Sequence, residues 1–440
     1  MQTQGLLQRY FKLEQHGTNV KTEIIAGITT FLTMVYIVFV NPSILGVAGM
    51  DSQSVFITTA LIAAFGSIFM GLLANLPVAL APAMGLNAFF AYTVVAKLGL
   101  SWQVGMGTIF WGAVGLFLLT LFQVRYWLIA SIPTSLRVGI TAGIGLFIAL
   151  MGFQNSGIVV ASPATLVTLG NLYSSQVLLA ILGFFIIAIL ASRNIHAAVL
   201  VSIAVVTALS LLLGNVEYQG IFSMPPSVSN VVGQVDLAGA LDIGLLGIVF
   251  SFMLVNLFDS SGTLLGVTEK AGLADDKGRF PKMKQALLVD SVSSVTGAYI
   301  GTSSVTAYIE SSSGVSVGGR TGLTAIVTGI LFLLVIFLSP LASLVPLYAT
   351  AGALIYVGIL MSSSLIKVRW DDLTEATPAF ITAALMPFTY SITEGIAFGF
   401  ISYCVMKLFT GKAKQISIPV WVVSVLFLIK IIFIDKGIMH

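Results

Sequence analysis

Four acidic side chains in the second half of this 440-residue chain lie inside or beside long apolar stretches: Asp242, Asp259, Asp290 and Glu310. A carboxylate at the centre of a membrane span costs roughly 2.5–3.5 kcal/mol even on lenient scales, so such a residue is a functional candidate by default. Asp242 directly follows a polar loop, where a charge at a helix N-terminus is the simpler interpretation. The other three lie deeper: we expect Asp259 and Glu310 to bind a ligand or to carry protons, while Asp290 either does so or supports the site.

Glu310 is the strongest candidate because of the segment that surrounds it. Gly301–Gly322 (GTSSVTAYIESSSGVSVGGRTG) begins with hydroxyl and β-branched residues and ends in serines and glycines. Broken backbone at membrane depth is tolerated only where protein or a water-filled cavity surrounds it. A carboxylate there can accept two hydrogen bonds from the N–H groups of a planar ligand. Ser303 and Thr306 either contact this ligand or form a strand, and the sequence leaves both open.

Asp259 lies well inside the apolar run Asp242–Val267, within the stretch LVNLFDSSGTLLGV. Asn256, Asp259 and Thr263 recur at helical spacing and therefore share one face of the predicted helix. A polar stripe in lipid must turn toward protein or toward a cavity. We therefore expect Asp259 and Thr263 to contact the ligand, while helix packing explains Asn256 equally well.

Asp290 shares a predicted helix face with Ser293, Ser294 and Gly297. We expect no basic residue within the spans to neutralise it. Its carboxylate either holds the non-helical backbone of the following segment in place or contacts the substrate or a proton. The sequence does not separate site support from proton coupling.

The site is expected to lack a cationic side chain, because Lys97 and Arg320 fall at the ends of spans. An anionic ligand would meet three carboxylates, so a neutral or cationic ligand rich in N–H donors fits better. Carboxylates without fixed counter-cations also suit proton coupling, because burial favours the uncharged form. With one cysteine, three scattered histidines and no phosphate-binding P-loop, we expect no metal, no cofactor and no ATP-driven step. The same scarcity of nucleophiles and bases argues against an intramembrane enzyme.

The composition is that of an integral membrane protein, because 57% of the residues are hydrophobic and 8% are charged, against about 25% charged in soluble domains. Long uninterrupted apolar runs indicate helices rather than barrel strands. The small net charge of +3 gives no reason to expect nucleic-acid binding.

The fourteen predicted segments are Glu23–Leu45, Ser54–Asn75, Ala79–Ala96, Val104–Tyr126, Pro133–Phe153, Gln176–Ser192, His196–Gly214, Asp242–Val267, Lys282–Ile300, Gly301–Gly322, Leu323–Leu341, Val345–Ser364, Thr377–Thr389 and Glu394–Thr410.

Seven of these segments precede a long polar loop at 215–241 and seven follow it. An odd number in each half predicts two halves of opposite orientation, an inverted repeat. The third segment of each half, Ala79–Ala96 and Gly301–Gly322, is interrupted by proline, glycine or serine, which is typical of a transporter binding site. In the first of them, Asn87 offers a donor and an acceptor, and Phe89 offers a stacking face.

The basic residues predict the topology. With the N-terminus inside, nearly all lysines and arginines fall in cytoplasmic loops, Lys97 being the exception. Residues 1–22 are expected to form a cytoplasmic or interfacial segment. Ile418–Ile434, within the terminal region 411–440, is expected to be an interfacial helix rather than a fifteenth crossing. Both termini are then cytoplasmic, in a multi-pass protein of the bacterial cytoplasmic membrane.

The chain resembles the nucleobase:cation symporter superfamily (NCS2), in its AzgA-like purine permease branch, and within that branch the bacterial adenine permeases. The resemblance extends over nearly the whole chain. The segments that carry it are Gly27–Pro42 (GITTFLTMVYIVFVNP), Asn75–Tyr92 (NLPVALAPAMGLNAFFAY), Phe258–Leu273 (FDSSGTLLGVTEKAGL), Val289–Ala325 and Pro387–Phe400 (PFTYSITEGIAFGF).

This resemblance implies an all-α polytopic membrane protein with the fold of uracil permease and short strands in segments three and ten. It implies a core domain (23–126 and 242–341) and a gate domain (133–214 and 345–410). Asp259 and Glu310 take the places of the two acids that bracket the base in that family. Thr263 replaces the histidine of uracil permease, so proton coupling would depend on Asp259, Glu310 and Asp290.

The implied activity is proton-coupled import of a purine base, most specifically adenine, by alternating access, and relatives of the fold suggest a homodimer. A hypoxanthine or guanine permease, or an anion exchanger or channel on the same fold, are the alternatives.

Overall fold

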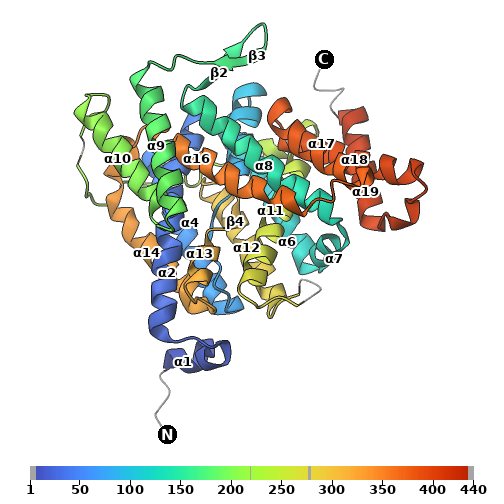
Figure 1. The fold of residues 1–440 in the computed structure, drawn as a ribbon, viewed down its shortest axis with the longest axis horizontal. Coiled ribbons are helices and arrows are strands. Elements are labelled where there is room, and N and C mark those ends of the chain that lie inside the picture. The colour runs from blue at the N-terminus through green and yellow to red at the C-terminus, as the bar shows by residue number, and fades with distance from the viewer. Residues whose placement is uncertain (1–5, 219, 276–278, 435–440) are drawn as a thin grey trace.

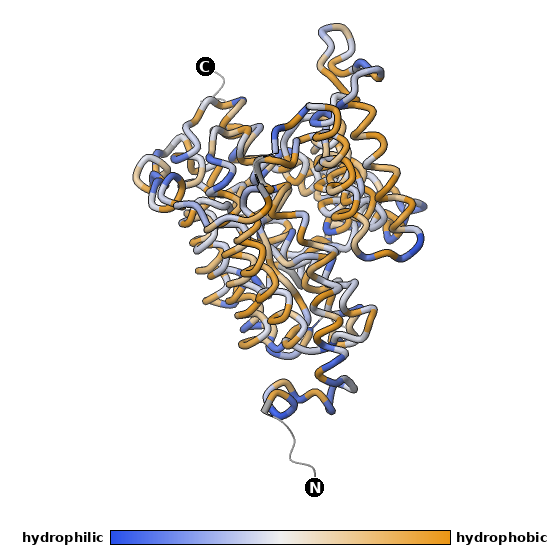
Figure 2. The backbone as a smooth tube through the Cα atoms, turned by 90° about the vertical axis from the view of Figure 1, so that its left-hand side faces the viewer, coloured by the Kyte–Doolittle hydropathy of each residue, from blue (hydrophilic) through white to orange (hydrophobic). Residues whose placement is uncertain are grey.

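The computed structural model describes residues 6–218, 220–275 and 279–434 as a bundle of helices (Figure 1). Eight helices in this part of the chain are long and apolar enough to cross a membrane, and three shorter apolar helices accompany them. In Figure 2 apolar residues run along the helices, and most of the hydrophilic ones gather at their ends and in the connections. The structure is thus mainly helical, as the sequence predicts.

The helices of the first half are α1 (Leu6–Phe11), α2 (Val20–Met34), α3 (Ile37–Val47), α4 (Ser52–Phe69), α5 (Met84–Ala88), α6 (Trp102–Leu121), α7 (Val124–Ser131), α8 (Thr134–Asn155), α9 (Ser175–Ser192) and α10 (Ala198–Leu212). Those of the second half are α11 (Leu246–Lys270), α12 (Met283–Tyr299), α13 (Ser311–Ser316), α14 (Gly322–Val335), α15 (Pro340–Leu344), α16 (Leu347–Ser362), α17 (Leu373–Thr389), α18 (Ile392–Phe409) and α19 (Ile418–Ile429). Every predicted segment except the two broken ones is found as a helix or as consecutive helical pieces.

The two broken segments meet as a pair of short antiparallel strands. β1 (Leu80–Pro82) pairs with β4 (Val305–Ala307), with Ala81 opposite Thr306. A π-helix, η3 (Phe89–Lys97), follows α5 after the first strand, and α13 follows the second. The prediction of short strands in segments three and ten is therefore confirmed.

Serine hydroxyls on two neighbouring helices bond one residue on the outer edge of each strand. The Ser67 hydroxyl on α4 accepts from the Leu80 amide (3.0 Å) and donates to the Leu80 carbonyl (3.3 Å). The Ser294 hydroxyl on α12 donates to the Val305 carbonyl (2.8 Å) and accepts from its amide (3.3 Å). Water does not reach the bilayer core, so such partners are required for any strand placed there.

Three local features were not predicted. The first membrane segment is divided, because a turn at Val35 and Tyr36 separates α2 from α3. A hairpin of β2 (Val159–Ser162) and β3 (Leu166–Leu169) projects from the bundle after α8 (Figure 1). The short helix α7 begins at Val124, immediately after Gln123, whose backbone has the left-handed conformation.

The last helix, α19, lies antiparallel along α18. The Cys404 sulfur and the Ser424 hydroxyl are 3.1 Å apart, and Lys430 forms a 2.6 Å ion pair with Glu394 at the start of α18. These contacts hold α19 against the bundle over its length. Its position relative to the membrane surface stays a prediction.

A buried carboxylate joins the first helix of the bundle to α14. Glu23 on α2 is fully buried and accepts hydrogen bonds from the backbone amides of Arg320 (2.9 Å), Thr321 (3.3 Å) and Thr324 (3.2 Å), and from the Thr324 hydroxyl (2.6 Å). The first amides of a helix lack intrahelical acceptors, so this side chain serves as a cap supplied by another helix.

We expect Glu23→Ala to lower the free energy of unfolding by about 1–3 kcal/mol, because buried amides lose their acceptor. Thermal unfolding of the purified protein in detergent measures this loss. Glu23→Gln, which keeps one acceptor oxygen, should cost less, and Glu217→Ala at an exposed loop position should cost nothing measurable. Equal stability of Glu23→Ala and Glu217→Ala would contradict the capping role.

Candidate functional site

A cavity of about 670 Å³ lies between two groups of elements and is lined by both. One side is formed by α11, by the residues from Thr306 to Glu310, and by the start of α5. The other side is formed by α8, by α16 and by the 3-10 helix η7 (Ser363–Lys367). The β1–β4 strand pair thus lies directly behind the first wall.

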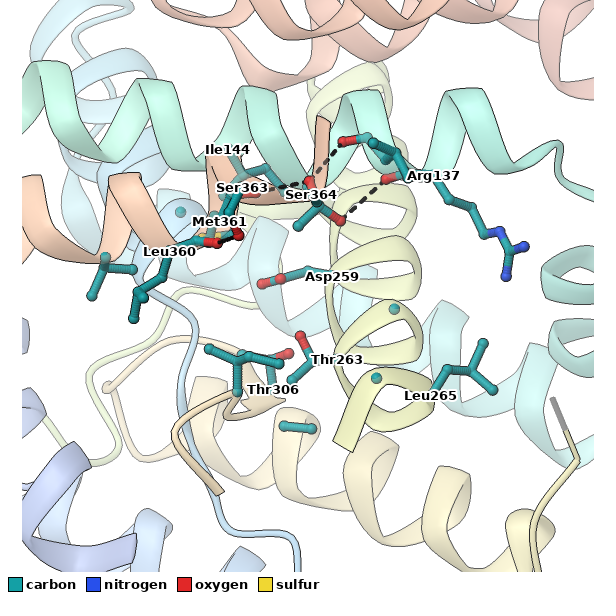
Figure 3. Close-up of a pocket in the computed structure, with 18 of the residues that line it drawn as sticks. Arg137, Ile144, Asp259, Thr263, Leu265, Thr306, Leu360, Met361, Ser363 and Ser364 are labelled. Carbon is teal, nitrogen blue, oxygen red and sulfur yellow. Dashed lines mark hydrogen bonds between the residues drawn. The ribbon is translucent and has the colours of Figure 1, made fainter. Parts of the chain in front are cut away.

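Four of the predicted site residues line this cavity: Asp259, Thr263, Thr306 and Glu310. Figure 3 shows Asp259 projecting from α11 toward Ser363 and Ser364, with Thr263 one turn further along and Thr306 close to it. The helical spacing predicted for Asp259 and Thr263 does place them on one face. The Thr306 hydroxyl is buried and has no hydrogen-bond partner among the described residues, so it is available to form a hydrogen bond with a ligand.

Glu310 occupies the link between β4 and α13. Its Oε1 accepts a hydrogen bond from the Tyr36 hydroxyl at 2.5 Å, and the Thr33 hydroxyl lies 3.4 Å from its backbone carbonyl. Tyr36 lies in the break of the first segment, and Thr33 lies in the last turn of α2 before it. The sequence analysis did not select Tyr36, because a single tyrosine in an apolar run carries no signal that separates a site residue from a packing one.

Asn87, Ser303 and Phe89 are buried but do not line the cavity. Asn87 donates to Asn41, and the Ser303 hydroxyl has no partner within the described structure. Phe89 packs on Phe252 with ring centroids 5.1 Å apart. These three lie behind the cavity wall, and any role for them in ligand binding would be indirect in this conformation.

Asp290 does not reach the cavity and is paired with a cation, which corrects the expectation that no basic residue neutralises it. The Arg125 guanidinium lies 2.8 Å from its Oδ2, with both side chains fully buried, and Ser260 donates to its other oxygen. Arg125 also bonds the Ser291 hydroxyl (3.2 Å). Because α7 turns inward after Gln123, Arg125 is buried rather than placed in a loop. The strand backbone that Asp290 was expected to hold is bonded by Ser294 instead.

Cationic side chains do occur at the edge of the cavity, which corrects a second expectation. Arg137 on α8 and Lys367 in η7 both belong to its lining, as does Glu269 at the end of α11. In Figure 3 the Arg137 side chain extends away from Asp259. The Arg137 Nε is buried and has no hydrogen-bond partner among the described residues. The distribution of basic residues predicted that Arg137 and Lys367 lie in cytoplasmic loops, and in the structure both belong to the lining of the cavity.

The cavity combines these polar groups with an apolar wall from Met84, Ile144, Ile148 and Val357. Tyr308 is the aromatic residue of the lining among the described residues. Two carboxylates on one side and aliphatic side chains on the other suit a flat ligand that carries N–H donors. Asp242, in contrast, lies in the exposed turn before α11 and accepts from the Gly244 amide (2.8 Å), as a surface charge does.

A helical membrane bundle with a polar cavity between two groups of helices, lined beside broken segments, is the architecture of a secondary transporter. Residues 21–398 match the model of the permease family, and the chain belongs to that family.

Curated relatives match over almost the full length. The chain is 74% identical to the adenine permease AdeP of Escherichia coli K12, over 98% of this chain and 97% of the relative. It is 67% identical to the adenine permease AdeQ of the same strain, with the same coverage. It is 42% identical to the guanine/hypoxanthine permease PbuO of Bacillus subtilis, over 96% of this chain and 99% of the relative.

Solved structures with low sequence identity share the fold. The transmembrane domain of the cyanobacterial bicarbonate transporter BicA superposes with a TM-score of 0.65 at 15% identity, covering 86% of this chain and 97% of that domain. SLC26A9 superposes with a TM-score of 0.63 at 13% identity, covering 89% of this chain and 66% of that protein. At such identities the likeness concerns the fold alone.

We expect Arg125→Met to destabilise the protein by about 3–5 kcal/mol, because it leaves the Asp290 carboxylate buried without its partner. The double variant Arg125→Met/Asp290→Leu should recover most of that loss, since both charges are then removed together. Thermal unfolding in detergent measures the stability, and uptake assays in cells measure the function.

If Asp290 only supports the site, the double variant is folded and retains uptake. A stable double variant without uptake would instead assign Asp290 a part in transport. Equal stability of Arg125→Met and the wild type would contradict the ion pair as a structural element.

Proposed function

We propose that this protein imports adenine across the bacterial cytoplasmic membrane as a proton-coupled secondary transporter. The observation that carries this proposal is the pair of carboxylates, Asp259 and Glu310, that face one cavity beside the broken segments. The relatives at 74% and 67% identity are named adenine permeases, which supports the choice of substrate. Family and relatives are permeases, so the protein acts by moving its ligand rather than by changing it.

Glu310 and Asp259 accept hydrogen bonds from the N–H groups of the base, and the free hydroxyl of Thr306 with that of Thr263 adds adaptable polar contacts. The aliphatic wall opposite covers the face of the ring. Adenine presents an amino group at the position where hypoxanthine and guanine present a carbonyl oxygen. Two carboxylate acceptors fit this amino group, but they also fit the N1–H of hypoxanthine and the N1–H and 2-amino group of guanine, so the choice of adenine rests on the relatives named adenine permeases.

Transport proceeds by movement of a core domain (23–126 and 242–341) against a gate domain (133–214 and 345–410), with the cavity between them. Fourteen segments in two inverted halves make up these domains. Two pairs of contacts support the repeat. Ser67 and Ser294 bond the strands that follow their own helices, and Asn41 and Asn256 each bond a hydroxyl on the next helix of their own half, at 2.7 Å and 3.1 Å.

The cavity opens toward the end of the bundle where α8 begins and α11 ends, since Thr134 and Glu269 are in its lining. With the N-terminus cytoplasmic, this end is the inner one. We therefore assign the conformation to an inward-open step of the cycle, in which adenine is released to the cytoplasm.

The coupled proton is carried by Asp259 or Glu310, because both line the cavity and neither forms an ion pair among the described residues. Asp290, paired with Arg125, acts as a support. A homodimer in the membrane completes the proposal for the assembled protein.

An anion exchanger is the second candidate. The fold is shared with proteins named bicarbonate and anion transporters, and Arg137 and Lys367 stand at the cavity mouth. Against it, an anion that passes them meets the carboxylates of Asp259 and Glu310. The two candidates therefore differ in the sign of charge that the deepest part of the cavity accepts.

The substrate is tested by uptake of radiolabelled adenine into cells that lack their own purine permeases. We expect saturable accumulation that excess unlabelled adenine abolishes and that hypoxanthine and guanine leave nearly unchanged. Equal competition by hypoxanthine would move the assignment to the other purines. Failure to take up any purine, together with exchange of bicarbonate or chloride, would replace it by the anion exchanger.

Proton coupling is tested in the same cells. An uncoupler should abolish adenine accumulation, and Glu310→Gln and Asp259→Asn should each lower uptake about tenfold or more, the scale of a hydrogen bond to a charged group. Glu269→Gln is the matched control, because Glu269 lines the same cavity at its exposed mouth. Accumulation that survives the uncoupler would refute proton coupling and leave the substrate assignment intact.

A further inference from the structure

The two carboxylates of the cavity differ in how they are held. Glu310 accepts a 2.5 Å hydrogen bond from Tyr36, while the described residues supply no hydrogen bond to the carboxylate of Asp259. Tyr36 is 1% exposed, so its hydroxyl has no access to bulk water. Oε1 of Glu310 is therefore held by the hydrogen bond from Tyr36, while Oε2 takes no part in that bond.

The helix that precedes Tyr36 packs closely on the broken tenth segment. A Cβ atom added at Gly314 of α13 would lie only 2.6 Å from the Ala26 carbonyl oxygen of α2, so the two helices are in direct backbone contact there. The Thr33 hydroxyl adds its contact to the Glu310 carbonyl at 3.4 Å. Tyr36 lies three residues after Thr33, in the turn between α2 and α3.

A second buried tyrosine provides a contrast within the same site. Tyr308 is 3% exposed and lies two residues before Glu310. Its hydroxyl donates to the backbone carbonyl of Pro82 at 2.6 Å and so joins the two strands. The two phenols thus have similar burial, but only that of Tyr36 bonds the carboxylate.

We propose that Tyr36 is the positioning residue of the site, which holds Glu310 Oε1 so that Oε2 faces the cavity as an oriented acceptor for the ligand. The inference deepens the proposed function and rests on it for the identity of the ligand. Tyr36 itself does not line the cavity, so it acts through Glu310. Without the hydroxyl, the Glu310 side chain loses the contact that selects its orientation, and the ligand must order it on binding.

A double-mutant cycle on adenine binding tests this inference. Titration calorimetry on the purified protein should give a Kd about tenfold higher for Tyr36→Phe than for the wild type, the scale of a hydrogen bond to a charged group. In the Glu310→Gln background the same substitution should change the Kd by less than about twofold, because residues that act as a unit are non-additive. Tyr308→Phe, the matched control, should have the same effect in both backgrounds. An equal effect of Tyr36→Phe in both backgrounds, or no effect in either, overturns the proposal.

Infrared spectroscopy provides a second test of the contact between Tyr36 and Glu310, and this test needs no ligand. The pH-difference spectrum of the wild type contains a carboxylate band of Glu310, assigned by its loss in Glu310→Gln. Tyr36→Phe should shift that band, and Tyr308→Phe should leave it in place. If Tyr36→Phe does not fold, fluorotyrosine at position 36 keeps the shape, strengthens the donor and should shift the band as well.

The two proposals fail separately. A wild-type protein that does not bind adenine refutes the substrate, while a shifted Glu310 band still supports Tyr36 as its positioning residue. A band that neither Tyr36→Phe nor fluorotyrosine moves refutes the role of Tyr36, whether or not adenine binds.

Discussion

The structure depends on the need to satisfy the backbone of two three-residue strands inside a membrane bundle. Each strand has two edges, and the pairing of β1 with β4 satisfies only the inner ones. Hydroxyls on α4 and α12, from Ser67 and Ser294, bond one residue on each of the outer ones. Four separate stretches of chain must therefore assemble before any irregular backbone is tolerated there. The cavity lies beside this assembly, and Thr306 and Glu310 in its lining belong to the stretch of chain that contains β4.

The acidic side chains of the bundle are compensated in two different ways. Arg125 and Asp290 are buried together and neutralise each other, and Glu23 is enclosed by the amides of another helix. Asp259 and Glu310 line an open cavity, where a ligand, a proton or water can compensate them. Burial alone thus does not mark a functional carboxylate; the distinction is whether the protein itself has already supplied the compensating group.

The sequence predicted those features that depend on residue types along one stretch. Proline, glycine and serine marked the two broken segments, and carboxylates in apolar runs marked Asp259 and Glu310. Contacts between distant segments were missed. Arg125 reaches Asp290 through a turn at Gln123 that hydropathy does not register, and Tyr36 resembles any tyrosine of a span. Phe89 was selected for its ring, but it begins the π-helix η3, whose wider turn changes which side chains share a face, and it packs on Phe252.

The pairing of β1 with β4 also has a consequence for how the protein is made. β1 leaves the ribosome long before β4, its strand partner in the described structure, and until then its inner edge lacks the hydrogen bonds that β4 supplies. Lipid tails cannot form hydrogen bonds with the exposed backbone groups of such an edge. The first half must therefore wait during biogenesis, with its third segment kept at the membrane surface or sheltered by the insertion machinery. We therefore expect this segment to insert after the second half has been made, so that the order of assembly differs from the order of synthesis.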